Sequence, residues 1–238
     1  MRLAVVPVAS VEINPVVPVY SEILRQRRYT CVSKQNHNFL FNAIAPVYGL
    51  FYKKQQKRYR EVIRSVADEW NRNGYKSILD VGCGTGALCS VLNENGLSVT
   101  GVDPAENMLA IASRQPENKN IRFLQANALE QLPFADKSFD LSIASYVAHG
   151  LQKSERMKLY SEMRRVTRSK VIIYDYNQNR SLLTSFVEWL EHGDYFGFIK
   201  NPKSEMENCA IELEKCFSDV TVVDVDNRAA WYVCTPRS

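Results

Sequence analysis

Apolar positions follow two alternating patterns from residue 77 onward. Short apolar runs with the length of buried strands alternate with longer stretches in which apolar residues recur every three or four positions. The strand-like runs lie at 77–81, 98–102, 121–125, 139–144 and 170–174, and the helix-like stretches lie at 87–95, 105–114 and 154–166. This alternation is typical of an α/β fold, a parallel Rossmann-like sheet with helices on both faces.

The C-terminal part of the chain departs from this alternation. A helix-like stretch at 204–216 is followed by strand-like runs at 219–224 and 229–234, with a short turn between them. A parallel crossover needs about a dozen residues or more, so these two strands must be antiparallel. We therefore expect a seven-stranded sheet that is mostly parallel and has an antiparallel final strand.

The N-terminal part divides into an extension and a helical region. Residues 1–35 lack glycine, contain three prolines and show no helical period, which predicts a poorly ordered extension that is not removed. The domain then covers 36–238, and apolar positions over 36–72 predict helical stretches with a break at Pro46. An aromatic-rich segment at 178–203 is expected to be an insertion that covers a substrate.

Composition and charge narrow the function classes. The chain has 238 residues, of which 45% are hydrophobic and 24% charged, as in an ordinary globular protein with one main domain. The net charge of +4 is too small to indicate nucleic-acid binding by itself. Residues 1–60 hold ten basic and two acidic residues, so the head is basic and the remainder mildly acidic.

The six cysteines and the lack of a long apolar run bear on the compartment. The cysteines are scattered, with no C-x-x-C pair and no other metal-ligand spacing, so we expect reduced thiols and no metal site. No apolar run approaches the roughly 20 residues of a membrane helix. These features predict a cytoplasmic protein.

A glycine-rich turn after the first strand is the strongest chemical signal. Gly82, Gly84 and Gly86 lie where an open parallel sheet presents bare backbone and a helix N-terminus to a ligand. With Ala87 the turn also satisfies a dinucleotide pattern, so an NAD-dependent oxidoreductase remains an alternative. Asp80, just before the first glycine, would repel a pyrophosphate but would attract the ammonium and sulfonium groups of S-adenosylmethionine.

A second acid follows the second strand. Asp103 stands where such folds place a carboxylate on the ribose hydroxyls of a bound adenosine, a feature that both cofactor classes share. Each acid also has a structural alternative. Asp80 would cap a helix, and Asp103 would be the N-cap of the helix that begins near Ala105.

These motifs together resemble a known family. From about Asn36 to Cys234 the chain is similar to class I S-adenosylmethionine-dependent methyltransferases of the small-molecule group that includes the ubiquinone and menaquinone biosynthesis enzymes. The segments that carry the resemblance are 41–48 (an entry helix), 78–86 (the glycine motif), Val102-Asp103-Pro104 (the ribose motif), 123–128 (the adenine loop), 132–134 and 138–140. The resemblance implies S-adenosylmethionine as the cofactor and leaves the acceptor open.

The resemblance also implies roles for individual residues. Asn127 would face the adenine amino group, where the family usually has Asp, and the backbone N–H of Ala128 would meet a ring nitrogen. Pro104 and Ser145 would line the cofactor. Tyr48 would close a helical lid over it, with ordinary helix packing as the alternative. Thr167-Arg168-Ser169 replaces the family's Pro-Gly-Gly turn, which predicts a shortened loop before the fifth strand.

Candidates for acceptor chemistry follow the fourth and fifth strands. Methyl transfer needs alignment of the acceptor, and a base only where the acceptor must lose a proton. His149 is the best candidate for that base, and packing against a loop is its alternative. Asp175 would be a second base or a substrate anchor, or would cap a turn. Tyr146 is a third catalytic candidate.

Competing functions use the same cofactor motifs. Five basic residues, Lys53, Lys54, Lys57, Arg58 and Arg60, would contact phosphates in an RNA methyltransferase, although such a cluster usually only solvates a helix. The sequence favours a small-molecule methyl acceptor, and the aromatic residues of 178–203 suit a flat or apolar one. A cofactor-binding protein without an acceptor site is the non-enzymatic alternative.

Overall fold

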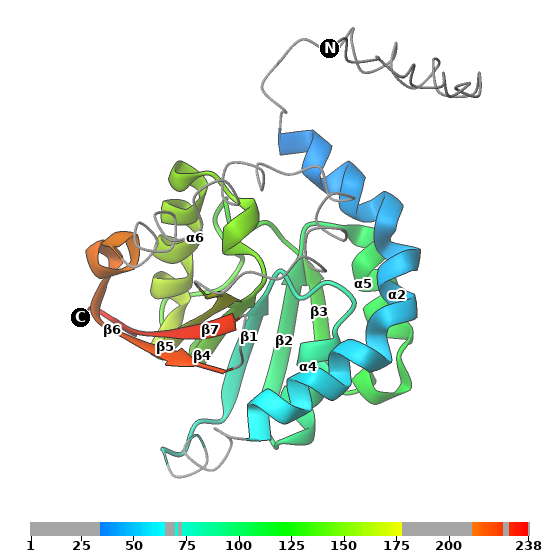
Figure 1. Cartoon of the computed structure of the whole chain (residues 1–238), viewed down its shortest axis with the longest axis horizontal. Helices are drawn as coiled ribbons and strands as arrows, with labels where there is room; N and C mark the ends of the chain where they lie inside the picture. Colours follow the sequence, from blue (N-terminus) through cyan, green and yellow to red (C-terminus); the bar gives the residue numbers. More distant parts are fainter. Residues whose placement is uncertain (1–33, 65–69, 71–72, 178–210, 226–228, 238) are drawn as a thin grey trace, which may run out of the picture. The chain divides into compact units, whose positions relative to one another are not determined.

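Seven strands form one sheet in the order β3-β2-β1-β4-β5-β7-β6 (Figure 1). The computed structural model describes residues 34–64, 70, 73–177, 211–225 and 229–237. Residues 1–33 of the predicted extension and the whole predicted cover segment at 178–203 lie outside the described residues. The strands are β1 Ser77–Val81, β2 Ser98–Asp103, β3 Arg122–Gln125, β4 Phe139–Ser145, β5 Thr167–Tyr176, β6 Phe217–Asp224 and β7 Ala229–Pro236.

The strand directions confirm the predicted fold class. Strands β1 to β5 pair in parallel, whereas β7 runs antiparallel to both β5 and β6. All five predicted parallel strands are present within a few residues of their expected ends, and so is the antiparallel pair at the C-terminus. The order places β1, with its glycine turn, between β2 and β4. Here the strand order reverses: β2 and β3 lie on one side of β1, and β4 and β5 lie on the other, which is the position at which such sheets bind ligands.

Helices cover both faces of the sheet (Figure 1). They are α2 Lys34–Arg64, α4 Ala87–Glu94, α5 Glu106–Arg114 and α6 Lys153–Val166, with short 3-10 turns η1 Pro116–Asn118 and η2 Ala148–Gly150. On one face, Leu79 of β1 packs in a cluster with Leu159 of α6. On the other, Ile78 of β1 packs with Leu92 of α4 and Ile63 of α2. Adjacent strand residues point to opposite faces, so β1 contributes to both cores.

Helix α2 runs through Pro46 without the predicted break. A proline inside a helix cannot donate to the carbonyl four residues earlier, which here is that of Asn42. Asn107 of α5 takes over this role, because its Nδ2 donates to the Asn42 carbonyl oxygen at 3.0 Å and its backbone N–H donates to Asn42 Oδ1 at 2.8 Å. The expectation of two helical stretches was wrong at this point because it ignored a neighbouring helix.

The predicted loop at 167–169 is also absent. Helix α6 ends at Val166 and β5 begins at Thr167, which pairs with Phe139 of β4. The Thr167 hydroxyl is buried and donates to Ser142 Oγ at 2.7 Å, so this residue is fixed in the sheet. The predicted shortening therefore extends to the whole loop, because β5 already begins at Thr167, which pairs with Phe139 of β4.

A buried ion pair connects α6 with the helical residues 211–216. Arg156 donates from Nε and Nη2 to both carboxylate oxygens of Glu212, at 2.8 and 3.0 Å, and from Nη1 to the Leu151 carbonyl oxygen at 2.9 Å. The two side chains are 5% and 2% exposed. This pair therefore joins the helix before β5 to the helix before β6.

None of the helices that the structure describes is long and apolar enough to cross a bilayer.

Candidate functional site

The turn between β1 and α4 depends on its three glycines. Gly82, Gly84 and Gly86 all have positive φ angles, of 73°, 52° and 76°, in the left-handed region that favours glycine. The backbone N–H groups of Gly82 and Cys83 both donate to the Val102 carbonyl oxygen, at 2.8 and 3.0 Å, which holds the turn against the end of β2. The turn thus has a fixed shape.

The surroundings of these glycines differ. A Cβ at Gly82 would lie 2.5 Å from Val147, and one at Gly86 would lie 2.7 Å from Asn118, so both positions exclude a side chain. A Cβ at Gly84 would meet no atom of the described residues within 4 Å. In the part of the chain that the structure describes, no side chain caps the N-terminus of α4, which follows the turn directly. Gly84 therefore marks an open side of the turn where a ligand can approach the backbone.

Asp80 is a buried carboxyl at the end of β1. It is 1% exposed, and its Oδ2 accepts a hydrogen bond from the Cys89 thiol of α4 at 3.0 Å. Within the described residues, its Oδ1 is buried without a hydrogen-bond partner. Burial raises the pKa of Asp80 to about 7, against the opposing hydrogen bond from Cys89. An acid with one unsatisfied oxygen in such a place is a site for a cationic group.

Asp103 joins the end of β2 to the glycine turn. Its Oδ2 accepts from the Gly84 N–H at 2.9 Å, and its Oδ1 accepts from the Ala105 N–H at 2.8 Å. The alternative role as the N-cap of α5 was wrong, because Ala105 is the N-cap residue and no described side chain caps this end of the helix. Each carboxylate oxygen can accept more than one hydrogen bond, so these contacts leave room for ribose hydroxyls. Burial raises the pKa of this carboxyl.

The predicted adenine loop follows β3 beside Asp103. The Ala126 N–H donates to the Asp103 carbonyl oxygen at 3.2 Å, and the Pro104 carbonyl oxygen accepts from Gln125 Nε2 at 3.1 Å. Asn127 Oδ1 accepts from the Leu129 N–H at 3.0 Å and so stabilises a turn that buries Ala128. The structure thus places the predicted ribose and adenine residues at neighbouring strand ends.

Two further predicted cofactor residues contact α2 or belong to it. Tyr48 is half-buried in an apolar cluster with Ala105 and Met108, at the start of α5. Ser145, at the end of β4, shares a hydrogen bond of 3.0 Å with the hydroxyl of Tyr59, a residue of α2 that sequence reasoning missed. Tyr59 is one of the apolar positions at 36–72 whose spacing predicted a helix, and that spacing carries no signal of a polar contact.

The two principal catalytic candidates form a pair. His149 Nδ1 lies 2.9 Å from Asp175 Oδ1, and the His149 backbone N–H donates to Asp175 Oδ2 at 3.1 Å. Their side chains are 9% and 6% exposed. The carboxylate comes from the end of β5 and the imidazole from η2, after β4. Asp175 therefore orients a histidine, which sequence reasoning did not predict because the two residues are 26 positions apart.

Tyr146 lies next to this pair in an unusual backbone conformation. Its φ angle is 56°, which few non-glycine residues adopt and which occurs often at functional sites. Its ring packs against Tyr174, Tyr176 and His149, with centroids 5.0, 5.1 and 6.4 Å away. Its hydroxyl accepts from Arg58 Nη2 at 3.1 Å, and burial raises its pKa. Tyr146 thus forms an aromatic wall beside His149 and is no ready proton donor.

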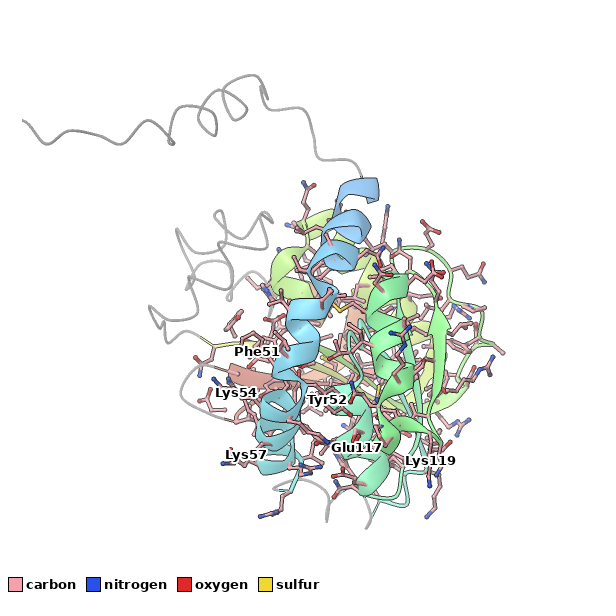
Figure 2. The ribbon with its side chains drawn as sticks, turned by 90° about the vertical axis from the view of Figure 1, so that its right-hand side faces the viewer. Phe51, Tyr52, Lys54, Lys57, Glu117 and Lys119 are labelled. Carbon is pink, nitrogen blue, oxygen red and sulfur yellow. The ribbon has the colours of Figure 1, made fainter. Side chains whose placement is uncertain are left out.

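The basic cluster of α2 is largely engaged within the protein. Lys53 pairs with Glu117, Arg60 makes two hydrogen bonds of 2.8 Å to Glu94, and Arg58 binds Tyr146. Figure 2 shows Lys54 and Lys57 on the side of α2 opposite Tyr52, which faces α5. Three of the five basic residues therefore serve internal contacts, which weakens the case for a phosphate-binding surface.

Comparison with known proteins identifies this arrangement. Residues 78–170, which contain the glycine turn, both predicted cofactor acids and the segment of His149, match the model of a family described as a methyltransferase domain. This region is a class I S-adenosylmethionine-dependent methyltransferase domain. The predicted family resemblance and the predicted cofactor are thereby confirmed.

Relatives of this methyltransferase domain cover it to different extents. A demethylmenaquinone methyltransferase of Thermus thermophilus is 38% identical over 136 residues, which are 53% of this chain and 59% of that protein. An uncharacterized methyltransferase of Staphylococcus carnosus is 25% identical over 193 residues, 74% of this chain and 90% of that protein. The chain spans about half the length of several other curated relatives, 43% in a Geobacillus protein and 54% in one from Bacillus subtilis.

A solved structure supports the fold of the methyltransferase domain. A Methanococcus maripaludis protein, provisionally described as an S-adenosyl-L-methionine-dependent methyltransferase, superposes with a TM-score of 0.62 at 18% identity. The match covers 89% of this chain and 98% of that one. At this level of identity the likeness concerns the fold, which agrees with the mixed seven-stranded sheet.

The geometry of the methyltransferase domain fits its cofactor. Asp80 Oδ1 is a buried acceptor without a partner among the described residues, which suits the positive charge of S-adenosylmethionine. Gly84 leaves space against the backbone, and Asp103 has acceptor capacity for hydroxyl groups. A pyrophosphate would instead meet the Asp80 carboxyl at this turn, which counts against a dinucleotide.

Proposed function

We propose that this protein transfers the methyl group of S-adenosylmethionine to a small-molecule acceptor, with His149 as the general base. The pair of His149 and Asp175 carries this proposal, because it places an oriented imidazole after β4, the strand next to the one that leads into the glycine turn. The Thermus relative is named for methylation of demethylmenaquinone, which supports a flat, apolar acceptor.

Residues of this chain supply binding, alignment and proton removal. When bound, S-adenosylmethionine would supply an activated methyl group, whose carbon an acceptor atom can attack in line while the sulfonium sulfur leaves as the neutral thioether of S-adenosylhomocysteine. The glycine turn and Asp103 hold the adenosine end, and Asp80 attracts the cationic end. The aromatic rings of Tyr146 and Tyr176, beside His149, offer a flat apolar wall for the acceptor.

His149 would accept a proton from the acceptor as the methyl bond forms. Its Nδ1 is engaged with Asp175, so Nε2 is the nitrogen that takes the proton. Asp175 fixes the ring orientation and stabilises the imidazolium that results, as the carboxylate does in other acid–histidine pairs. This assignment makes Asp175 a positioning residue, which revises its predicted role as a second base.

A screen with labelled cofactor tests the proposed function. Purified protein is incubated with methyl-labelled S-adenosylmethionine and a metabolite extract, and the labelled product is identified by mass spectrometry. We expect label in a small molecule. Label in RNA with none in the metabolite fraction would overturn the proposal, as would calorimetric binding of NAD without binding of S-adenosylmethionine.

Replacement of Asp103 by alanine is expected to weaken cofactor binding. The variant removes a charged acceptor for ribose hydroxyls and also the Oδ2 contact that holds the Gly84 N–H. Loss of a hydrogen bond to a charged group costs about 1.5–3 kcal/mol, or roughly tenfold to a hundredfold in affinity. Calorimetric titration with S-adenosylmethionine measures this loss, and Asp219→Ala on β6 is the control. Equal affinity of Asp103→Ala and wild type would contradict the ribose assignment.

A further inference from the structure

Asp80 is held by a donor that sequence reasoning left without a role. The Cys89 thiol, in the first turn of α4, donates to Asp80 Oδ2 at 3.0 Å, and both residues are buried. Burial raises the pKa of Cys89 well above its ordinary value, so the thiol stays protonated and remains a donor throughout the physiological range. The thiol can therefore donate to Asp80 at any physiological pH.

The two oxygens of Asp80 have different environments. Oδ2 is occupied by Cys89, whereas Oδ1 is buried without a hydrogen bond within the described residues. A thiol is a weak donor compared with a hydroxyl or an amide. Such a donor fixes the orientation of the carboxyl and binds only Oδ2, so Oδ1 is left for a ligand.

On these contacts we propose that Cys89 is a positioning residue for the cofactor: its thiol orients Asp80 so that Oδ1 meets the cationic end of S-adenosylmethionine. This inference rests on the proposed function. Among the described residues, the titratable side chains that interact with the charge of Asp80 are Cys89 of α4, Cys83 of the glycine turn, Asp103 of β2 and Tyr59 of α2. None of these four is basic, which is consistent with a compensating charge that comes from the cofactor cation.

The arrangement makes cofactor affinity depend on pH. The pKa of Asp80 is raised to about 7 in the ligand-free protein, so the carboxyl is protonated below that pH and ionised above it. A cation binds the ionised form. Affinity for S-adenosylmethionine should therefore rise as the pH increases through about 7, and the midpoint should respond to the donor at position 89.

Two substitutions at Cys89 move this midpoint in opposite directions. Cys89→Ala removes the donor, so the midpoint should rise, by about one pH unit for a contact of roughly 1.4 kcal/mol, and affinity at pH 6 should fall up to about tenfold. Cys89→Ser replaces the thiol by a stronger donor, so its midpoint should fall below that of wild type. Cys234→Ala, which removes a buried thiol from β7, is the matched control and should leave the midpoint unchanged.

The experiment combines calorimetry with a measurement on the ligand-free protein. Dissociation constants of S-adenosylmethionine are determined from pH 5.5 to 8.5, and those of 5′-methylthioadenosine, which lacks the cationic groups, serve as the ligand control. The Asp80 carboxyl is titrated separately by carbon NMR, with Asp80→Asn to assign its signal. We expect the Cys89 variants to shift the titration midpoint of the Asp80 carboxyl and, by the same amount, the pH at which the affinity for S-adenosylmethionine is half-maximal. Binding of methylthioadenosine should stay independent of pH.

The outcomes separate the inference from the proposed function. A structural role of Cys89 would change affinity by the same factor at every pH, and unshifted midpoints in Cys89→Ala and Cys89→Ser would overturn the inference while S-adenosylmethionine still binds. Absence of S-adenosylmethionine binding by the wild-type protein would overturn the proposed function, and the cofactor role of Cys89 with it. Equal pH dependence for methylthioadenosine would show that Asp80 does not meet the cation.

Discussion

Replacement of His149 by alanine is expected to lower the turnover number by about 10²–10⁴, the usual contribution of a positioned general base. Asp175 orients the imidazole through Nδ1, so the variant loses a proton acceptor that is already positioned for the reaction. Steady-state kinetics with the acceptor from the labelling screen measures the change. The affinity for S-adenosylmethionine, measured by calorimetry, should remain near that of wild type.

Asp175→Asn is the companion variant for this prediction. Asparagine keeps the size of the side chain but loses the charge that stabilises an imidazolium, so turnover should fall less than in His149→Ala. The pH profile distinguishes the two roles, because a general base makes the turnover number rise with pH around its pKa. Asp175→Asn should move this rise to lower pH, and His149→Ala should abolish it. Normal turnover in His149→Ala would make the histidine a structural partner of the loop.

Replacement of Arg156 by methionine is expected to destabilise the fold by about 3–5 kcal/mol, because Glu212 would be left as a buried, unpaired charge. Both side chains are almost fully buried and joined by two hydrogen bonds. The double variant Arg156→Met/Glu212→Leu should lose less, because it removes both charges together. Urea unfolding followed by circular dichroism measures the free energy of unfolding of each variant.

An exposed pair provides the matched control for this measurement. Arg60 and Glu94 also make two short hydrogen bonds, of 2.8 Å each, but their side chains are 39% and 38% exposed. Arg60→Met should therefore cost no more than about 1 kcal/mol. If Arg156→Met and Arg60→Met cost the same, the buried pair would not be the connection between the two helices that its geometry indicates.

The deviations from the predicted elements have tertiary causes. The proline rule predicted a break in α2, but Asn107 of α5 binds the carbonyl that Pro46 leaves unpaired. The polar residues of 167–169 suggested a shortened loop, but β5 already begins at Thr167, which pairs with Phe139 of β4. Both errors concern backbone groups whose partners come from elsewhere in the chain, which a local pattern cannot reveal.

The sequence by itself determined the order of strands and helices, the mixed sheet and the glycine turn with its two acids, because periodicity, turn chemistry and motif spacing are local properties. The tertiary structure decided which side chains meet. It joined His149 to Asp175 and Cys89 to Asp80, and it left Asp80 Oδ1 without a hydrogen bond within the described residues. These contacts depend on the register of parallel strands and on helix packing, in which residues distant in sequence approach to hydrogen-bonding distance.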